Sequence, residues 1–378
     1  MDIFNHQGIT YYRQGDTICN NLIGQLQQKG ILMSTLVLEI AIDFQPLLEK
    51  AEQRLQEAVN QGGAYGTSGT RRASWTSGTC GTRGTIGNLA AQIIKAGGKR
   101  LRPLLVILSG WKEDGDCDSL LDVAVAAELL HTASLIHDDI IDKADNRRGI
   151  PTLNVIKGQH TAVITGDYLF ARALTLLSEQ NTNRALPCLI QSIESMCEGI
   201  IEEINSVYNP AITEQDYLSR IDKKTASLVA ACCEAGARIR GASPPEVDAH
   251  AAFGHNLGMC FQIVDDILDF TADEKTLGKP ADSDFSQGIL TLPVIYLLQD
   301  SNWSQPVRRI LAKRSCTNDE LSYVKKGIHK TASLQLAYEK ALQYQDKAKA
   351  CLASFPTTPE PVRSIFHKLT EMVMERIK

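Results

Sequence analysis

The sequence lacks paired cysteines and an excess of basic residues. Its ten cysteines are scattered without any C-x-x-C pair, which argues against a disulfide framework and indicates a reduced, cytoplasmic protein. The formal net charge is −5, so the composition offers no basic face to neutralise the phosphates of a nucleic acid. We therefore expect neither a secreted protein nor one that binds nucleic acid.

The sequence also shows no pattern typical of a leader segment or of a membrane span. The first residues, MDIFNHQGITYYRQGD, are polar and contain no apolar core followed by a small-residue cleavage site. The apolar stretch at 31–42 is interrupted by Glu39 and is too short to cross a bilayer. We expect a soluble chain.

Aromatic residues are few, at 6% of the chain, whereas alanine and leucine dominate long stretches. This composition favours helices over sheets. No alternation with a period of two is long enough to build a sheet. The sequence therefore predicts an all-α fold.

The helical pattern is interrupted near the N-terminus. Residues 44–59 have the apolar spacing of an amphipathic helix. Residues 62–87 contain five Gly-Thr pairs and almost no aliphatic side chains, so we expect a Gly/Thr-rich flexible loop there. Residues 1–32 match no pattern and are expected to be an N-terminal extension, with Met33 as the true initiator of a domain that spans 33–378.

An apolar run, LLHTASLIHDDIID, ends in Asp138, Asp139 and Asp142. Buried carboxylates cost free energy unless a positive partner compensates for their desolvation. In a helix, Asp138 and Asp142 lie one turn apart on the same face, with Asp139 beside them. The sequence therefore predicts that this cluster binds a positively charged partner.

A second cluster with the same spacing, DDILD, occurs at residues 265–269. The two clusters face a common space if their helices pack antiparallel. Mg²⁺ prefers carboxylate oxygens combined with water and substrate phosphates, which suits a few spaced ligands rather than a closed cage. One cluster alone would be interpreted as a solvated helix end, but two of them indicate a magnesium site.

Basic residues lie near both ends of the first acidic helix. The segment GGKRLRP carries Lys99, Arg100 and Arg102 at a turn, and Arg147 and Arg148 follow the first cluster. Guanidinium groups bind phosphate oxygens in a bidentate way. An aspartate–metal side and a basic side could thus each hold one diphosphate, whereas GGKRLRP alone would be interpreted as a loop with solvated charges.

Six ordered blocks give the sequence a specific resemblance. They are GGKRLRP, LLHTASLIHDDIID, NRRGIPT, GDYLFARA, KTASL and FGHNLGMCFQIVDDILDFTADEKTLGKPADSDF. In this order they resemble the trans-type (head-to-tail) isoprenyl diphosphate synthases, the polyprenyl synthase family. The likeness covers residues 34–378 apart from the Gly/Thr-rich stretch. It implies the isoprenoid synthase fold, a single large helical domain with a central cavity.

The resemblance implies a role for each matching position. Three Mg²⁺ ions that hold the allylic diphosphate would be bound by Asp138, Asp139, Asp142, Asp265, Asp266 and Asp269. The diphosphate of isopentenyl diphosphate would be held by Lys99, Arg102, His131 and Arg148. The allylic diphosphate would contact Arg147, Lys224 and Lys279. Thr225 and Gln262 would lie near the developing allylic cation, with dipoles that stabilise it.

The implied reaction is a sequential condensation, in which the double bond of isopentenyl diphosphate attacks the cation left by the departing allylic diphosphate. This chemistry needs no nucleophile–base pair, and none is recognisable in the sequence. Ala133 and Ser134 precede the first cluster where aromatic residues shorten the product in this family. Both are too small to do so, which implies a long product, built on a primer such as farnesyl diphosphate and used for quinone side chains. By position, Phe170 and Leu174 are candidates for the end of the product tunnel.

Two positions depart from the family pattern. The segment GILTLP at 288–293 has no basic residue where the family usually has a second one. Ile200 stands where a glutamate is common. One contact to the allylic diphosphate is therefore expected to be missing.

Several alternatives stay open. The chain could be a short-chain synthase, making geranylgeranyl or farnesyl diphosphate, or a subunit that is active only with a partner. A class I terpene cyclase would not need GGKRLRP, and a non-catalytic subunit or lipid carrier would not need both aspartate clusters. Broad apolar helix faces predict a homodimer, or a heterodimer with a small partner subunit. The hydrophobic product suggests peripheral contact with a membrane, without an encoded anchor.

Overall fold

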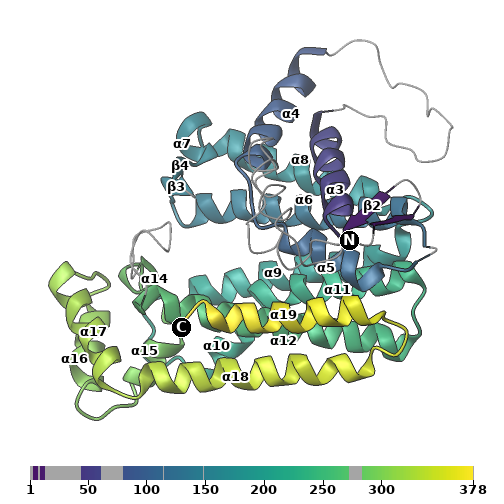
Figure 1. Ribbon diagram of the computed structural model, residues 1–378. Coiled ribbons are helices and arrows are strands. Elements are labelled where there is room, and N and C mark those ends of the chain that lie inside the picture. Colours follow the sequence, from purple (N-terminus) through teal and green to yellow (C-terminus); the bar gives the residue numbers. More distant parts are fainter. Residues whose placement is uncertain are drawn as a thin grey trace.

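Helices form most of the computed structural model, which describes residues 3–6, 9–12, 44–60, 80–113, 115–147, 149–271 and 283–377 (Figure 1). This confirms the expected all-α architecture. The α-helices are α3 (Gln45–Asn60), α4 (Cys80–Lys95), α5 (Leu101–Gly110), α6 (Cys117–Ile141), α7 (Leu153–Lys157), α8 (Gln159–Leu177), α9 (Leu186–Ser206), α10 (Glu214–Ile221), α11 (Ser227–Arg240), α12 (Pro244–Thr271), α14 (Ser283–Ser286), α15 (Leu292–Leu297), α16 (Ser304–Ala312), α17 (Asn318–Lys330), α18 (Ser333–Cys351) and α19 (Glu360–Glu375). Short 3₁₀ turns are η2 (Asn183–Ala185) and η4 (Leu352–Ser354), and η3 (Asp222–Ala226) is a π-helix.

Two short strand pairs were not expected from the sequence. Strands β1 (Ile3–His6) and β2 (Ile9–Tyr12) pair antiparallel, as do β3 (Asn146–Arg147) and β4 (Ile150–Pro151). Within the described ranges no strand exceeds four residues, which is too short to show a period-two pattern.

The expected loop at 62–87 is too long at its C-terminal end. Helix α4 begins at Cys80, so residues 80–87 are helical despite their glycines and threonines. Residues 61–79 lie outside the described residues, and so does Met33. The proposed domain start therefore stays a prediction.

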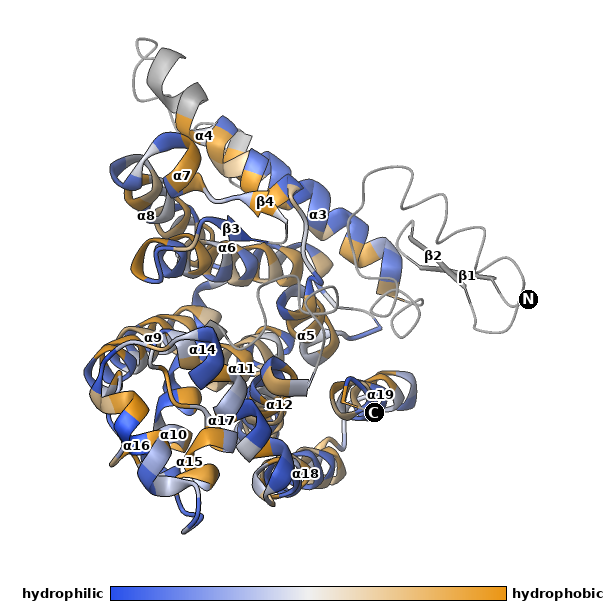
Figure 2. Ribbon diagram, turned by 90° about the vertical axis from the view of Figure 1, so that its left-hand side faces the viewer, coloured by the Kyte–Doolittle hydropathy of each residue, from blue (hydrophilic) through white to orange (hydrophobic). Residues whose placement is uncertain are grey.

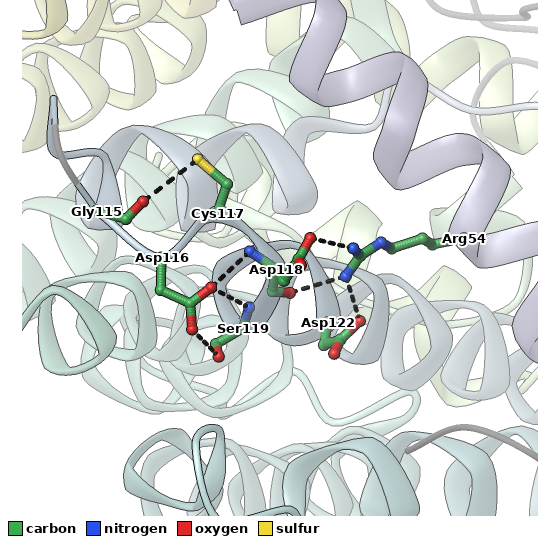
Figure 3. A network of polar contacts seen from close by, with 7 residues as sticks. All are labelled: Arg54, Gly115, Asp116, Cys117, Asp118, Ser119 and Asp122. Carbon is green, nitrogen blue, oxygen red and sulfur yellow. Dashed lines mark hydrogen bonds and ion pairs between the residues drawn. The ribbon is translucent and has the colours of Figure 1, made fainter. Parts of the chain in front are cut away.

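The N-terminus of α6 is fixed by its own cap and by α3 (Figure 3). The Asp116 carboxylate accepts hydrogen bonds from the backbone N–H groups of Asp118, at 2.9 Å, and Ser119, at 3.3 Å. This satisfies donors that have no partner inside the helix. Arg54 on α3 forms ion pairs with Asp118 and Asp122, the latter at 2.8 Å. These contacts set the direction in which α6 carries its aspartates.

Helix α6 lies at the centre of one half of the molecule, packed against α8, α5 and α3. Among the described residues it is the helix long and apolar enough to cross a bilayer, but 83% of its most apolar window is buried inside the fold. Such burial is typical of a core helix. Its apolar length is therefore explained by internal packing.

Helix α12 is the corresponding centre of the other half. It packs against α11, α18 and α19, and α18 and α19 run beside one another along one edge (Figure 1). The α19 helix ends near α14 and α15, which brings the C-terminal residues to the end of α12 that carries the second aspartate cluster. Helix α5 is buried from Pro103 to Gly110 and joins the two halves through α6 and α11.

Candidate active site

The first aspartate motif occupies the C-terminal end of α6. Asp138 lies inside the helix, and Asp142 caps it one turn later. Burial raises the pKa of Asp138 to about 6, although the nearby positive charge of Lys224 opposes this shift. A carboxylate held in such a place gains from a cation, as the sequence predicted.

Asp139 has a different environment from its two neighbours. It is 7% exposed, and its Oδ1 accepts a hydrogen bond of 2.7 Å from Nε of Arg147 in the β3 strand. Both residues line a cavity of about 70 Å³, together with His131 two turns earlier on α6. Two of the predicted diphosphate contacts, His131 and Arg147, are thus brought together around one space.

The GGKRLRP turn borders the same cavity through Gly97 and Arg100. Arg100 adopts a left-handed backbone conformation with φ of 50°, which is strained for a residue with a side chain. Its guanidinium binds Glu52 at 2.7 Å and Glu128 at 2.8 Å, and it is 7% exposed. These ion pairs connect the turn to α3 and α6 and offset the strain.

Arg100 is therefore a structural residue of the turn, while its two basic neighbours point elsewhere. Lys99 is exposed. Arg102 extends toward Glu128 and Cys232, and its buried Nε has no hydrogen-bond partner. Burial lowers the pKa of Arg102. A buried guanidinium with an unused donor is suited to binding an anionic ligand.

A π-helix, η3, carries the KT pair of the predicted allylic site. It lies between α10 and α11 and contains Lys224 and Thr225. The Lys224 ammonium forms an ion pair with Glu203 on α9. Burial lowers the pKa of Lys224, but the carboxylates of Glu203 and Asp138 outweigh this and raise it overall. Lys224 is therefore held as a cation beside the first motif.

Two glycines allow this π-helix to approach its neighbours closely. A Cβ atom at Gly199 on α9 would lie 2.7 Å from the backbone nitrogen of Lys224. A Cβ atom at Gly258 on α12 would lie 2.8 Å from Cα of Ala226. Neither separation is possible without movement of the backbone. The π-helix is thus clamped between α9 and α12, and such bulges are frequent at functional sites.

The second aspartate motif lies in the last two turns of α12. Asp265 forms an ion pair of 2.6 Å with Arg376, which follows α19 near the C-terminus. Asp269 is 1% exposed. Asp266 is 4% exposed, and burial raises its pKa to about 7, with the negative charge of Asp284 adding to the shift.

A chain of hydrogen bonds joins the π-helix to this motif. Thr225 donates its hydroxyl to Oε1 of Gln262 at 2.8 Å, and Nε2 of Gln262 donates to Oδ1 of Asp266 at 2.8 Å. The hydroxyl of Tyr217 on α10 donates to Oδ2 of Asp266 at 2.7 Å. Lys224 thus faces the first motif while its neighbour Thr225 is bonded toward the second.

Sequence reasoning missed three residues of this arrangement. Glu203 is paired with Lys224, Tyr217 with Asp266, and Asp284 on α14 acts electrostatically on both Asp142 and Asp266. Asp284 lies inside the last quoted block, so its position held a signal. Glu203 and Tyr217 are separated from their partners by 21 and 49 residues, and no local pattern reveals such pairs.

The residues expected near the product path have different surroundings in the structure. Ala133 is fully buried, and Ser134 is half-buried with its hydroxyl donated to the backbone oxygen of His131 at 2.9 Å. Phe170 packs against His137 at a ring-centroid distance of 5.7 Å. Leu174 is 37% exposed on the outer face of α8, so it does not line an internal path within this chain.

Two expected substrate contacts, Arg148 and Lys279, lie outside the described residues. Their roles stay predictions. Ile200 lies on α9 beside Gly199 and is half-buried, and its apolar side chain cannot replace a glutamate. The acid nearest Lys224 is Glu203, one turn further along the same helix.

The aspartates suit a metal ion that is shared with a substrate. Within the described part of the chain, no three acidic, histidine or cysteine side chains are close enough to form a metal cage. Mg²⁺ is commonly held by one or two carboxylates together with water and phosphate oxygens. Asp138 and Asp142, one turn apart and close to the cation of Lys224, present that kind of incomplete donor set. The residues therefore fit magnesium once a diphosphate completes the coordination.

Residues 84–328 match the polyprenyl synthetase family. The chain belongs to this family. Component 2 of the heptaprenyl diphosphate synthase of Geobacillus stearothermophilus is 42% identical over 72% of this chain and 84% of the relative. A geranylgeranyl diphosphate synthase of Saccharolobus solfataricus is 35% identical over 76% of this chain and 89% of the relative.

A solved structure of the family gives the same arrangement of helices. The polyprenyl synthase of Caulobacter crescentus CB15, complexed with calcium and isoprenyl diphosphate, superposes with a TM-score of 0.79. It is 31% identical, and the match covers 90% of this chain and 98% of that one. Membership of the polyprenyl synthetase family confirms the predicted isoprenoid synthase fold and prenyltransferase activity.

Proposed function

We propose that this polyprenyl synthetase family member is a long-chain trans-polyprenyl diphosphate synthase. It adds isopentenyl diphosphate repeatedly to an allylic diphosphate such as farnesyl diphosphate, in a magnesium-dependent reaction. The observation that carries the proposal is the pair of aspartate motifs near the π-helix: the charge of Lys224 acts on Asp138 of the first motif, and Thr225 is hydrogen-bonded through Gln262 to Asp266 of the second. Membership of the family and the 42% identical heptaprenyl relative support it.

The aspartates and basic residues divide the work of holding the allylic diphosphate. We assign the metal ions, three per site, to the first and last carboxylates of the two motifs: Asp138, Asp142, Asp265 and Asp269. When bound, Mg²⁺ supplies positive charge that stabilises the leaving diphosphate as the carbon–oxygen bond ionises. Lys224 and Arg147, with Lys279, add donors on the same side. Asp139 orients Arg147 through their 2.7 Å hydrogen bond.

Isopentenyl diphosphate is assigned to the GGKRLRP side of α6. Lys99 and Arg102, with His131 and Arg148, would contact its diphosphate. The buried, unused Nε of Arg102 and the position of His131 in the 70 Å³ cavity support this assignment. Because Arg147, assigned to the allylic diphosphate, lines the same cavity as His131, the two diphosphates would lie next to one another at the end of α6.

The product is proposed to be long because small residues precede the first motif. Ala133 and Ser134 lie on α6 above Asp138, on the side from which an elongating chain would leave the metal site. Their size supports a product of about thirty carbons or more, used for quinone side chains in the cytoplasm. The 35% identical geranylgeranyl relative keeps a short-chain product as the alternative.

Replacing Ala133 with phenylalanine tests this assignment. The added ring should shorten the dominant product by at least one five-carbon unit, although overpacking a fully buried site will cost about 1–3 kcal/mol of stability. Ser134→Ala is the matched control, because it removes a hydroxyl without filling space and should leave the length unchanged. An unchanged product from folded Ala133→Phe protein would remove the tunnel assignment.

A partner chain is also proposed, either a second copy or a small dissimilar subunit. Helices α7, α8 and α9 expose large apolar side chains that a soluble monomer would not expose together. These residues are Val155, Ile156, Val163, Ile164, Leu174, Ile190, Ile201 and Ile204. Figure 2 shows α7 in hydrophobic colours along most of its length, and none of its residues is buried. The two-component relative supports a dissimilar partner.

The decisive experiment uses the purified chain alone. It is incubated with labelled isopentenyl diphosphate, farnesyl diphosphate and Mg²⁺, and the dephosphorylated products are separated by chromatography while light scattering gives the oligomeric state. A ladder that ends at one long polyprenol supports the proposed reaction and activity without a dissimilar partner. Folded protein that forms no product alone, but does so with a small second component, supports the two-component form. Absence of product under both conditions refutes the proposed function.

A further inference from the structure

Asp266 differs from the other aspartates of the two motifs in how its carboxylate is used. Both of its oxygens accept short hydrogen bonds from protein donors, Tyr217 at 2.7 Å and Gln262 at 2.8 Å. Asp266 and Tyr217 are 4% and 0% exposed. A carboxylate enclosed in this way already has protein hydrogen-bond donors for both of its oxygens.

The bonds of Asp266 determine how Gln262 is oriented. An amide has one donor end and one acceptor end, and the donor end of Gln262 is used by Asp266. Its Oε1 must therefore face Thr225, and the hydroxyl of Thr225 must donate its proton to that oxygen. The lone pairs of the Thr225 oxygen are then left as acceptors, which can point only away from Gln262.

We propose that Tyr217 is a positioning residue for the condensation reaction. Through Asp266 and Gln262 it fixes the direction of the Thr225 hydroxyl, so that an oxygen lone pair rather than a proton faces the developing allylic cation. This inference rests on the proposed function, because it assigns the orientation of a group that the synthase reaction would use. It assigns Asp266 to the same relay and not to metal binding.

The surroundings of Tyr217 keep its hydroxyl in place. Helix α10 starts with a capping box formed by Thr213 and Asp216, and it continues directly into the π-helix that carries Thr225. The guanidinium of Arg220 lies 5.5 Å from the centre of the Tyr217 ring, and it is itself fixed by a 2.7 Å hydrogen bond to the backbone oxygen of Leu290. The relay therefore has a rigid origin.

A double-mutant cycle tests the relay. Tyr217→Phe removes the first donor and keeps the ring, and Thr225→Val removes the last hydroxyl and keeps the shape. We expect Tyr217→Phe to lower kcat about tenfold, from the loss of one buried hydrogen bond, with KM for both diphosphates changed by less than about twofold. In the double variant kcat should equal that of Thr225→Val alone, because no Thr225 hydroxyl is left for Tyr217 to orient.

Tyr296→Phe is the matched control. The Tyr296 hydroxyl donates to the Glu214 carboxylate at 2.9 Å, close to α10 but outside the relay. It should lower the thermal unfolding temperature and leave kcat within about twofold. If Tyr217→Phe and Thr225→Val instead lower kcat by factors that multiply in the double variant, Tyr217 acts independently of the Thr225 hydroxyl and the inference is wrong.

The magnesium dependence separates Asp266 from the metal ligands. Asp265→Asn should raise the Mg²⁺ concentration that gives half-maximal rate, whereas Asp266→Asn should lower kcat and leave that concentration unchanged. An equal rise in both variants would make Asp266 a ligand and overturn the relay. Wild-type protein that forms no product with or without a second component would instead refute the proposed function itself, and the inference with it.

Discussion

The two aspartate motifs have the same spacing, but the structure gives them different neighbours. The first lies at the end of α6, where its leading residue, Asp138, is the one whose pKa burial raises to about 6. The second lies in the last two turns of α12, where burial raises the pKa of its middle residue, Asp266, to about 7. The leading residue there, Asp265, is paired with Arg376.

This difference shows that a repeated motif does not imply repeated roles. In the first motif the middle residue, Asp139, holds an arginine that lines the cavity. In the second motif the middle residue is enclosed by Tyr217 and Gln262. In both, the middle aspartate is hydrogen-bonded to a neighbouring side chain, and we propose that the first and last aspartates bind the metal.

The largest expected effect comes from removing the leading aspartate of either motif. Asp138→Ala or Asp265→Ala should lower turnover by about 10²–10³-fold. Each variant lacks a carboxylate that would bind the Mg²⁺ ions that stabilise the leaving diphosphate. Steady-state rates and circular dichroism would be measured together. Asp248→Ala, an exposed aspartate on α12, is the control that should retain full activity.

Loss of folding instead of activity would contradict this prediction and make the aspartates structural. A large effect at Asp138 with a small one at Asp265 would break the equivalence of the two leading residues.

Much of the site could be predicted from sequence because its signals are local. The spacing in DDIID and DDILD places aspartates on one helix face in any helix, and Ala- and Leu-rich segments without strand alternation predict an all-α fold. The π-helix at 222–226 was not predicted, because it depends on how closely Gly199 and Gly258 allow α9 and α12 to approach. The start of helix α4 was predicted too late, because residues 80–87 are weak helix formers and yet are helical in the fold.

The second largest effect is expected at Gly199, which gives the π-helix its place between the motifs. Gly199→Ala would put a Cβ atom 2.7 Å from the Lys224 backbone, so Lys224 and Thr225 must shift together. Misplacement by about 1 Å can cost up to about 10²-fold in rate, and both motifs should be affected. The measurement is kcat together with the thermal unfolding temperature.

Gly327→Ala on α17 is the matched control, because the added Cβ atom would lie 2.6 Å from the Trp303 ring. It should destabilise the fold without a specific loss of kcat. Equal losses of kcat in the two variants would mean that the effect at Gly199 is only one of stability.

The third effect is a pH dependence of stability that distinguishes the motifs without any assay of turnover. The pKa of Asp138 is raised from 3.8 to about 6 in the folded chain. Between these values the folded state binds more protons than the unfolded state, so this contribution to stability is full below pH 3.8 and is lost as pH rises through about 6. Asp138→Asn has no proton to lose.

Relative to Asp138→Asn, the wild type should therefore lose about 1–3 kcal/mol of unfolding free energy as pH rises from 4 to 7. Denaturant titrations in EDTA would measure it. A constant difference between the two proteins across this range would show that burial does not perturb Asp138.

The smallest effect is expected at Arg376, whose guanidinium forms an ion pair with the first aspartate of the second motif. Its ion pair with Asp265 is partly exposed, at 25% and 35% for the two side chains, so it is worth less than about 1 kcal/mol. Arg376→Ala should lower the Mg²⁺ concentration for half-maximal rate by about two- to fivefold, because Asp265 no longer has a competing partner. A higher magnesium requirement would mean that Arg376 assists binding. Lys349→Ala, which breaks the 3.7 Å pair with Glu371 on α19, is the control.

The π-helix has a genetic consequence. A π turn closes its hydrogen bonds over one more residue than an α-helix does, so η3 is equivalent to a single inserted amino acid in an otherwise continuous helix from α10 to α11. Deleting one codon within 222–226 would convert this segment to a regular α-helical turn, which keeps α10 and α11 in register but removes the bulge that carries Lys224 and Thr225. Deleting one codon within α10 would instead rotate the residues before the deletion by about 100° relative to those after it. The length of this segment, and not only its composition, is therefore under constraint.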